Sequence, residues 1–327
     1  MDRRPLLEVR DLSVTFGSRR GPVRALDSVS LTIGEGEIVG IAGESGSGKS
    51  TLCYAIARSL PFNAHLDGSV KLSGRELLTL SERQMRSVRG RELSMILQNP
   101  MMSLDPVFRI GDQLGDLLKY VTGTRASERR QRSIELLREV QIPAAEERLK
   151  VYPHEMSGGM RQRVVTAMAT AARPRLVLAD EPTTALDVTI QDQILALFRD
   201  IRDKTGCAIA VVSHDLGLIR RLCDRVVVMY AGRVAEQGRV EDLFERPAHP
   251  YTKALIDALP KLGESRRRLP TIEGQPPNLL HRPPGCAFSD RCAFVMPRCR
   301  VERPRLITLP NSQQVACHLH DVATVAA

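Results

Sequence analysis

The chain has 327 residues, of which 43% are hydrophobic and 26% charged, and its formal net charge is +9. This length suffices for one large domain or two modest ones. No apolar run approaches the roughly 18–20 residues that a membrane-spanning helix needs, so we expect a soluble or peripheral protein. The basic charge fits contact with nucleic acid or an anionic membrane, but solvated arginine-rich helix faces explain it more simply.

The N-terminal part of the chain alternates short β patterns with turns. Residues 6–33 favour an antiparallel layer, and 37–42 form an apolar segment typical of a buried parallel strand. Residues 52–58 then indicate the start of a helix that Pro61 ends. Between strand and helix lies 43–51, Gly-Glu-Ser-Gly-Ser-Gly-Lys-Ser-Thr, which matches the phosphate-binding pattern G-x-x-x-x-G-K-S/T.

A strand, a glycine-rich turn and a helix are the context that this pattern requires. Glycines let backbone N–H groups turn inward, and the helix N-terminus adds positive potential for phosphates. We expect Lys49 to reach the β- and γ-phosphates and the Ser50 hydroxyl to hold Mg²⁺. The flanking segments disfavour the alternative, a glycine-rich turn that matches by chance. The predicted nucleotide ligands here are Gly43, Ser45, Gly46, Ser47, Gly48, Lys49, Ser50 and Thr51.

The middle of the chain changes from β to helical patterns. Residues 68–74 give another β segment, and a strand at 93–97 places Gln98 at its end. From about 104 to 172 the pattern is helical. Helices inserted between strands indicate a subdomain.

The βα alternation then returns and ends before the C-terminus. Past about residue 246 the chain is proline-rich and irregular, which indicates an appended region that does not continue the sheet. The strands predicted before it are 175–179, 207–212 and 225–230.

Two carboxylates follow the strand at 175–179. Ligands of open α/β sheets bind at the carboxyl ends of strands, so Asp180 and Glu181 are expected to face the same crevice as the phosphate loop. Asp180 suits Mg²⁺, directly or through water, and Glu181 suits a general base for the attacking water. An apolar run followed by Asp-Glu is common, so this pair alone is a weak signal.

The most specific motif lies at 156–163, Met-Ser-Gly-Gly-Met-Arg-Gln-Arg. Ser-Gly-Gly followed by Gln-Arg resembles the signature of ABC-type ATPases, and so does its spacing before Asp-Glu-Pro-Thr-Thr-Ala-Leu-Asp at 180–187. The resemblance extends from Leu6 to about Arg246. The other matching positions are Phe16 (the aromatic that stacks on adenine), Gln98 (the glutamine between subdomains), Asp187 (the dimer-facing aspartate) and His214 (the switch histidine).

This resemblance implies roles for the matched residues. ATP is held by the phosphate loop and Phe16, and Mg²⁺ by Ser50, Asp180 and Gln98. Ser157, Gly158 and Gly159 are implied to close over the nucleotide of an opposite subunit, where a hydroxyl, bare amides and a helix N-terminus make a second phosphate clamp. The implied catalytic residues are Lys49, Gln98, Glu181 and His214.

Met160 stands where the general signature has glutamine. Met-Arg-Gln-Arg resembles the D-type ATPase subunits of dipeptide and oligopeptide importers, as do Gln-Asn-Pro-Met-Met-Ser-Leu-Asp-Pro at 98–106 and His-Pro-Tyr-Thr at 249–252. The resemblance implies a paralogous ATPase subunit or a second copy as partner, two membrane permease subunits and an extracytoplasmic peptide-binding protein. It implies a peripheral position on the cytoplasmic face of the inner membrane and no nucleic acid.

Four cysteines gather near the C-terminus, at Cys286, Cys292, Cys299 and Cys317. Four thiolates suit zinc or an iron–sulfur cluster, but the chain has no Cys-x-x-Cys pair. The spacing therefore does not distinguish a zinc site, an iron–sulfur cluster and a set of packed thiols without a metal. Similar segments in the peptide-importer family hold a cluster, and the resemblance therefore implies a 4Fe–4S iron–sulfur cluster here.

Together these patterns predict an α/β fold with a P-loop NTPase (RecA-like) core, an antiparallel β layer, an inserted α-helical subdomain and an irregular C-terminal extension. The predicted boundaries are 1–100 and 173–245 for the core, 101–172 for the helical subdomain and 246–327 for the extension. The expected function is ATP hydrolysis that energises import of dipeptides or oligopeptides. The alternative is a non-transport ABC ATPase acting on nucleic acid or ribosomes.

Overall fold

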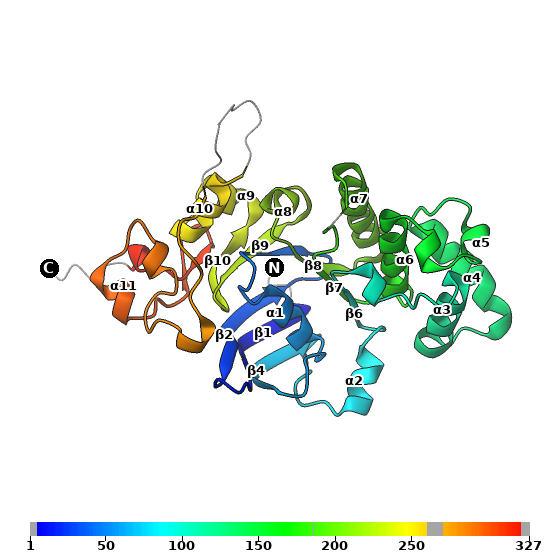
Figure 1. Cartoon of the computed structure of the whole chain (residues 1–327), viewed down its shortest axis with the longest axis horizontal. Helices are drawn as coiled ribbons and strands as arrows, with labels where there is room; N and C mark the ends of the chain where they lie inside the picture. Colours follow the sequence, from blue (N-terminus) through cyan, green and yellow to red (C-terminus); the bar gives the residue numbers. More distant parts are fainter. Residues whose placement is uncertain (1–4, 185, 260–270, 322–327) are drawn as a thin grey trace. The chain divides into compact units, whose positions relative to one another are not determined.

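The computed structural model describes residues 5–184, 186–259 and 271–321 (Figure 1). They form two compact units. The first consists mainly of Thr79–Val212, and the second of Leu7–Thr32, Val39–Leu78 and the described residues from Ser213 onward. Within the described ranges, no helix is long and apolar enough to cross a membrane.

The second unit contains an antiparallel sheet with the strand order β2-β1-β4-β5. Alternating burial along β1 and β2 places Leu, Val and Ile side chains on one buried face, as a half-buried sheet requires. This sheet confirms the predicted antiparallel layer. Its strands are β1 (Leu7–Phe16), β2 (Val23–Ile33), β4 (Ala64–Leu72) and β5 (Arg75–Glu76).

The second unit also holds the strand that leads into the phosphate loop. β3 (Ile38–Ala42) is completely buried and pairs in parallel with β9 (Arg225–Tyr230). β9 then pairs antiparallel with β10 (Arg233–Arg239). The helices of this unit are α1 (Lys49–Ile56), α8 (Leu216–Leu222), α9 (Val240–Glu245) and α10 (Pro250–Asp257).

The C-terminal region adds two short strands to β10, where the sequence indicated a region separate from the sheet. β12 (Gln314–Val315) pairs with β10 through Glu236 and Gln237, and β11 (Ile307–Thr308) pairs with β12. That part of the prediction was wrong, because two-residue strands leave no periodic signal. The rest of the region is irregular, as expected. It includes α11 (Pro297–Val301) and short turns of helix at Leu279–His281, Ser289–Arg291 and His318–His320.

The first unit is built on three parallel strands in the order β6-β7-β8, which are β6 (Leu93–Ile96), β7 (Leu176–Asp180) and β8 (Ala208–Val212). Every residue of β7 and β8 is buried, as parallel strands covered on both faces require. Helices α3 to α6, teal to green in Figure 1, lie together between β6 and β7 in the chain. The helices are α2 (Glu82–Val88), α3 (Ile110–Leu117), α4 (Ala126–Glu139), α5 (Ala145–Arg148), α6 (Gly158–Thr170) and α7 (Val188–Thr205).

Candidate functional site

The phosphate loop connects β3 to α1 in the second unit. Gly43 has φ +144°, and a Cβ there would lie 2.2 Å from the carbonyl oxygen of Met229. Gly48 has φ +99° and caps α1, and a Cβ there would lie 2.8 Å from Leu26 Cδ2. Both positions therefore require glycine. Because Gly48 supplies the cap, the helix begins at Lys49, three residues earlier than the apolar pattern indicated.

Lys49 is buried within the loop. Its Nζ donates to the carbonyl oxygens of Gly43 at 2.8 Å and Glu44 at 2.9 Å. Ser45 and Gly46, at the tip of the loop, are exposed. A buried ammonium, exposed backbone and a helix N-terminus together form an anion-binding site in the manner of a phosphate loop.

Phe16 and His214, two further predicted residues, also belong to the second unit. Phe16 is half-buried at the end of β1, where it pairs with Ala64. His214 is exposed just before Asp215, the residue that caps α8. The backbone N–H of Ser213 donates to the Ile41 carbonyl at 3.1 Å, so His214 follows a residue bonded to the strand that leads into the phosphate loop.

Asp180, Glu181 and Gln98 meet at the ends of β7 and β6 in the first unit. Gln98 Nε2 donates to Glu181 Oε2 at 2.9 Å, and Thr184 Oγ1 donates to the same oxygen at 2.8 Å. Asp180 is buried, with 2% of its surface exposed. Thr184 was not among the predicted site residues. Its place in the motif at 180–187, three residues after Glu181, is the signal that could have identified it.

Glu181 has an unusual backbone conformation. Its φ is +46°, in the left-handed region that L-residues rarely adopt. Its N–H donates to the Val212 carbonyl at 3.0 Å, which holds the residue in this conformation. Such backbone strain is concentrated at functional sites, where it aims a side chain.

The Ser-Gly-Gly motif opens α6. Ser157 is exposed and caps the helix by accepting a hydrogen bond from the Met160 N–H at 3.3 Å. Gly159 is buried against α7, and a Cβ there would lie 2.6 Å from Ile190 Cγ2. The exposed Asp187 caps α7 by accepting from the Ile190 N–H at 2.9 Å. Two helix N-termini therefore lie next to each other, with Gly158 between the cap and the buried glycine.

A cluster of charges surrounds the buried Asp27 on β2. Its carboxylate is paired with Arg233 at 2.7 Å and Arg282 at 2.7 Å, and Arg24 and Arg303 lie at 3.2 and 3.4 Å. Burial alone would raise the pKa of Asp27, but the hydrogen bond from Arg233 and the arginine charges outweigh it and lower the pKa to about 2. Two of these arginines belong to the C-terminal region, so the cluster ties that region to β2.

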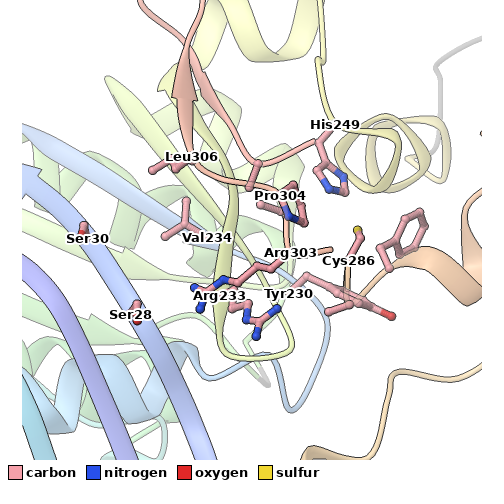
Figure 2. A pocket seen from close by; sticks show the side chains of 14 residues that line it. Ser28, Ser30, Tyr230, Arg233, Val234, His249, Cys286, Arg303, Pro304 and Leu306 are labelled. Carbon is pink, nitrogen blue, oxygen red and sulfur yellow. The ribbon is translucent and has the colours of Figure 1, made fainter. Parts of the chain in front are cut away.

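A cavity of about 70 Å³ lies beside this cluster. Arg233, Arg303 and Cys286 are among its lining residues, with Ser28 and Ser30 of β2 opposite Cys286 in Figure 2. The cavity is thus lined both by arginines of the charge cluster and by one of the four C-terminal cysteines.

The cysteines Cys286, Cys292, Cys299 and Cys317 all line one smaller cavity of about 10 Å³. Burial raises the pKa of Cys286 and Cys292, and it raises the pKa of Cys317 to about 11. Among the described residues, no three His, Cys, Asp or Glu side chains are grouped as ligands of one metal ion.

Comparison with known proteins identifies the family. A family described as ABC transporter matches residues 26–184, and one described as oligopeptide/dipeptide transporter, C-terminal region, matches residues 235–299. The oligopeptide transport ATP-binding protein OppD of Salmonella typhimurium is 46% identical over 299 residues, 91% of this chain and 89% of the relative. The dipeptide transport ATP-binding protein DppD of Escherichia coli is 44% identical over 314 residues, 96% of each chain.

A solved structure shows the same fold. The dimeric ATP-binding cassette MJ0796, in a post-hydrolysis state bound to ADP and Pi, superposes with a TM-score of 0.63. It is 28% identical and covers 72% of this chain and 98% of its own. The fold is therefore that of an ATP-binding cassette, as predicted. The chain belongs to the ABC transporter family, in the group that carries the C-terminal region of oligopeptide/dipeptide transporters.

Proposed function

We propose that the chain is the ATP-hydrolysing subunit that energises import of dipeptides or oligopeptides through an ABC transporter. One observation carries this proposal. A single chain combines a phosphate loop around the buried Lys49 with a C-terminal region that matches peptide transporters. Relatives named for oligopeptide and dipeptide transport match the chain over more than nine-tenths of its length.

ATP would bind through the phosphate loop. The N–H groups of the loop and the N-terminus of α1 offer donors and positive potential to the triphosphate. Lys49 Nζ would exchange its two carbonyl partners for phosphate oxygens, a charge-assisted and therefore stronger interaction. Phe16 would stack on the adenine.

Glu181 would act as the general base. Gln98 and Thr184 both donate to its Oε2, so its carboxylate is held in one orientation while it accepts a proton from the attacking water. His214 would contact the γ-phosphate. Ser50, Asp180 and Gln98 would hold Mg²⁺, which would supply charge neutralisation for the phosphates. Hydroxyl, carboxylate and amide oxygens are ligand types that this hard cation prefers, and Asp180 is buried.

The signature points to a two-subunit site. Ser157 and the N-terminus of α6 would cover ATP bound to a paralogue or to a second copy, with Asp187 facing the same partner. Ser157 and Asp187 are exposed, as this requires, and the MJ0796 cassette is itself dimeric. Met160, which stands where the general signature has glutamine, would lie next to this surface.

The permease subunits would dock on exposed apolar residues of the first unit, most of them in the segment that follows Gln98 in the sequence. Met102, Val107 and Phe108 expose 76%, 71% and 53% of their surface, and Met101 and Tyr120 are exposed too. Exposed apolar side chains gathered in one segment indicate a protein interface. The chain would then lie peripherally on the cytoplasmic face of the inner membrane, with an extracytoplasmic peptide-binding protein completing the transporter.

The four cysteines would hold a 4Fe–4S iron–sulfur cluster. Four thiols around one cavity are the donor set that such a cluster needs. Anaerobic purification should yield iron and acid-labile sulfide. Stoichiometric zinc without sulfide would contradict the cluster.

Co-purification of the chain with its proposed partner subunits tests the proposed function. The full chain, co-expressed with the candidate permease subunits and its paralogous ATPase subunit, should co-purify with them. Together with the peptide-binding protein, the complex should drive ATP-dependent peptide uptake into vesicles. Failure to bind permeases, combined with salt-dependent binding to nucleic acid, would favour the alternative of a non-transport ATPase.

A further inference from the structure

The C-terminal region contacts the phosphate loop at Glu44. Arg291 Nη1 donates to Glu44 Oε2 at 2.6 Å, and Arg291 Nη2 donates to Glu44 Oε1 at 2.9 Å. This is a two-bond pair between planar groups, the strongest form of ion pair in proteins. The Arg291 side chain is only 4% exposed and that of Glu44 26%, so solvent screens the pair little.

Arg291 is held in one orientation by other bonds. Its Nε donates to the Glu273 carbonyl at 2.9 Å, its Nη2 to the Ile272 carbonyl at 3.1 Å and its Nη1 to the Tyr230 hydroxyl at 3.2 Å. With the two bonds to Glu44, these account for all five N–H donors of a guanidinium. Its Cζ also lies 5.8 Å from the ring centroids of Tyr230 and Phe288.

Tyr251 holds the backbone of the same loop residue. The N–H of Glu44 donates to the Tyr251 hydroxyl at 2.8 Å. Tyr251 is completely buried, with its ring 4.6 Å from that of Tyr230 and 5.3 Å from that of Phe288. The carbonyl of Glu44 accepts from Lys49. The side chain and the N–H of Glu44 are therefore both bonded to residues beyond the ATPase motifs.

The charge of Glu44 makes this contact important. A carboxylate inside a loop that binds a triphosphate repels the ligand unless a cation neutralises it. Arg291 is the cation placed to do so, and its bidentate geometry also limits where the Glu44 side chain can lie. Neither Arg291 nor Tyr251 belongs to any of the motifs of the ATP site.

We propose that Arg291 and Tyr251 are positioning residues for ATP binding, which act by neutralising Glu44 and holding the phosphate loop in shape. The C-terminal region thereby sets the affinity of the chain for ATP. This inference rests on the proposed function, because it assumes that the loop binds ATP.

Equilibrium binding of Mg-ATP to the purified full chain tests the inference. Arg291→Gln should raise the ATP Kd about tenfold, because it leaves the Glu44 charge uncompensated beside the triphosphate. Adding Glu44→Gln to that variant should restore part of the affinity, because the repelling charge is then gone. The matched control is Arg300→Gln, which removes an exposed pair with Asp290 in the same region and should leave the Kd unchanged.

Kinetics and hydrogen exchange separate positioning from a general loss of structure. Arg291→Gln should raise KM for ATP and leave kcat nearly unchanged, since Arg291 does not contact the base Glu181. Should this variant not fold, Tyr251→Phe and Glu44→Gln serve instead. In the ATP-free chain each should speed amide exchange across residues 43–51 and leave exchange in the first unit unchanged.

The outcomes distinguish this inference from the proposed function. If Lys49→Ala abolishes ATP binding while Arg291→Gln binds with wild-type affinity, the inference is wrong and the proposed function stands. An unchanged amide exchange rate at 43–51 in Tyr251→Phe and Glu44→Gln also contradicts it. So does a double variant, Arg291→Gln with Glu44→Gln, that binds ATP more weakly than Arg291→Gln alone. If Lys49→Ala binds ATP normally, the proposed function itself fails.

Discussion

Replacing Glu181 by glutamine should separate ATP binding from hydrolysis. The amide of the Glu181→Gln variant keeps an oxygen that can accept the hydrogen bonds from Gln98 and Thr184, now at 2.9 and 2.8 Å, so the local structure should persist. The amide cannot take a proton from water. General-base catalysis contributes ~10²–10⁴-fold, so kcat should fall by that factor, equivalent to about 3–5 kcal/mol of transition-state stabilisation.

Phosphate release under saturating Mg-ATP, measured beside equilibrium ATP binding, is the assay. Glu128→Gln, at an exposed position in the first turn of α4, is the matched control and should retain wild-type turnover. Hydrolysis by Glu181→Gln within about twofold of wild type would show that Glu181 is not the base. A parallel loss of ATP affinity would show that the carboxylate acts in binding instead.

Three further changes have defined outcomes. Gly159→Ala should destabilise the first unit by roughly 1–3 kcal/mol in urea unfolding, because the new Cβ would lie 2.6 Å from Ile190 Cγ2, and unchanged stability would contradict that packing. The depressed pKa of Asp27, about 2 against an ordinary value of 3.8, should contribute about 2 kcal/mol of stability, present above pH 4 and lost as the pH falls through 2. Asp27→Asn should therefore lose that part of the pH dependence, which acid unfolding curves of the two proteins would show. Cys207, whose pKa burial raises to about 12, should resist alkylation by iodoacetamide at pH 8 in the native chain and react on unfolding, and rapid native labelling would contradict its burial.

The sequence predicted the parts of the site that depend on neighbouring residues. The phosphate loop is contiguous, so its glycines, Lys49 and flanking strand could be recognised together, and the apolar runs before Gln98 and Asp180 correctly placed both at strand ends. The start of α1 was misplaced by three residues because the cap at Gly48 depends on a left-handed backbone rather than on apolar periodicity.

The contacts that the sequence did not predict join residues far apart in the chain. Glu44 and Arg291 are separated by 247 positions, and Asp27 and Arg303 by 276. No local period or spacing marks such pairs, because their meeting depends on how the C-terminal region folds back onto β10. Arginine is common in this chain, so no single arginine could be selected from composition alone.

The pairing of β12 with β10 also concerns aggregation. β10 is buried along most of its length, and β12 covers its backbone at Glu236 and Gln237. A chain cut after α9 would present this part of β10 as an unprotected edge, a template on which a strand of another molecule can add. By pairing two short strands of its own with that edge, the C-terminal region leaves this part of β10 unavailable to a strand of another molecule.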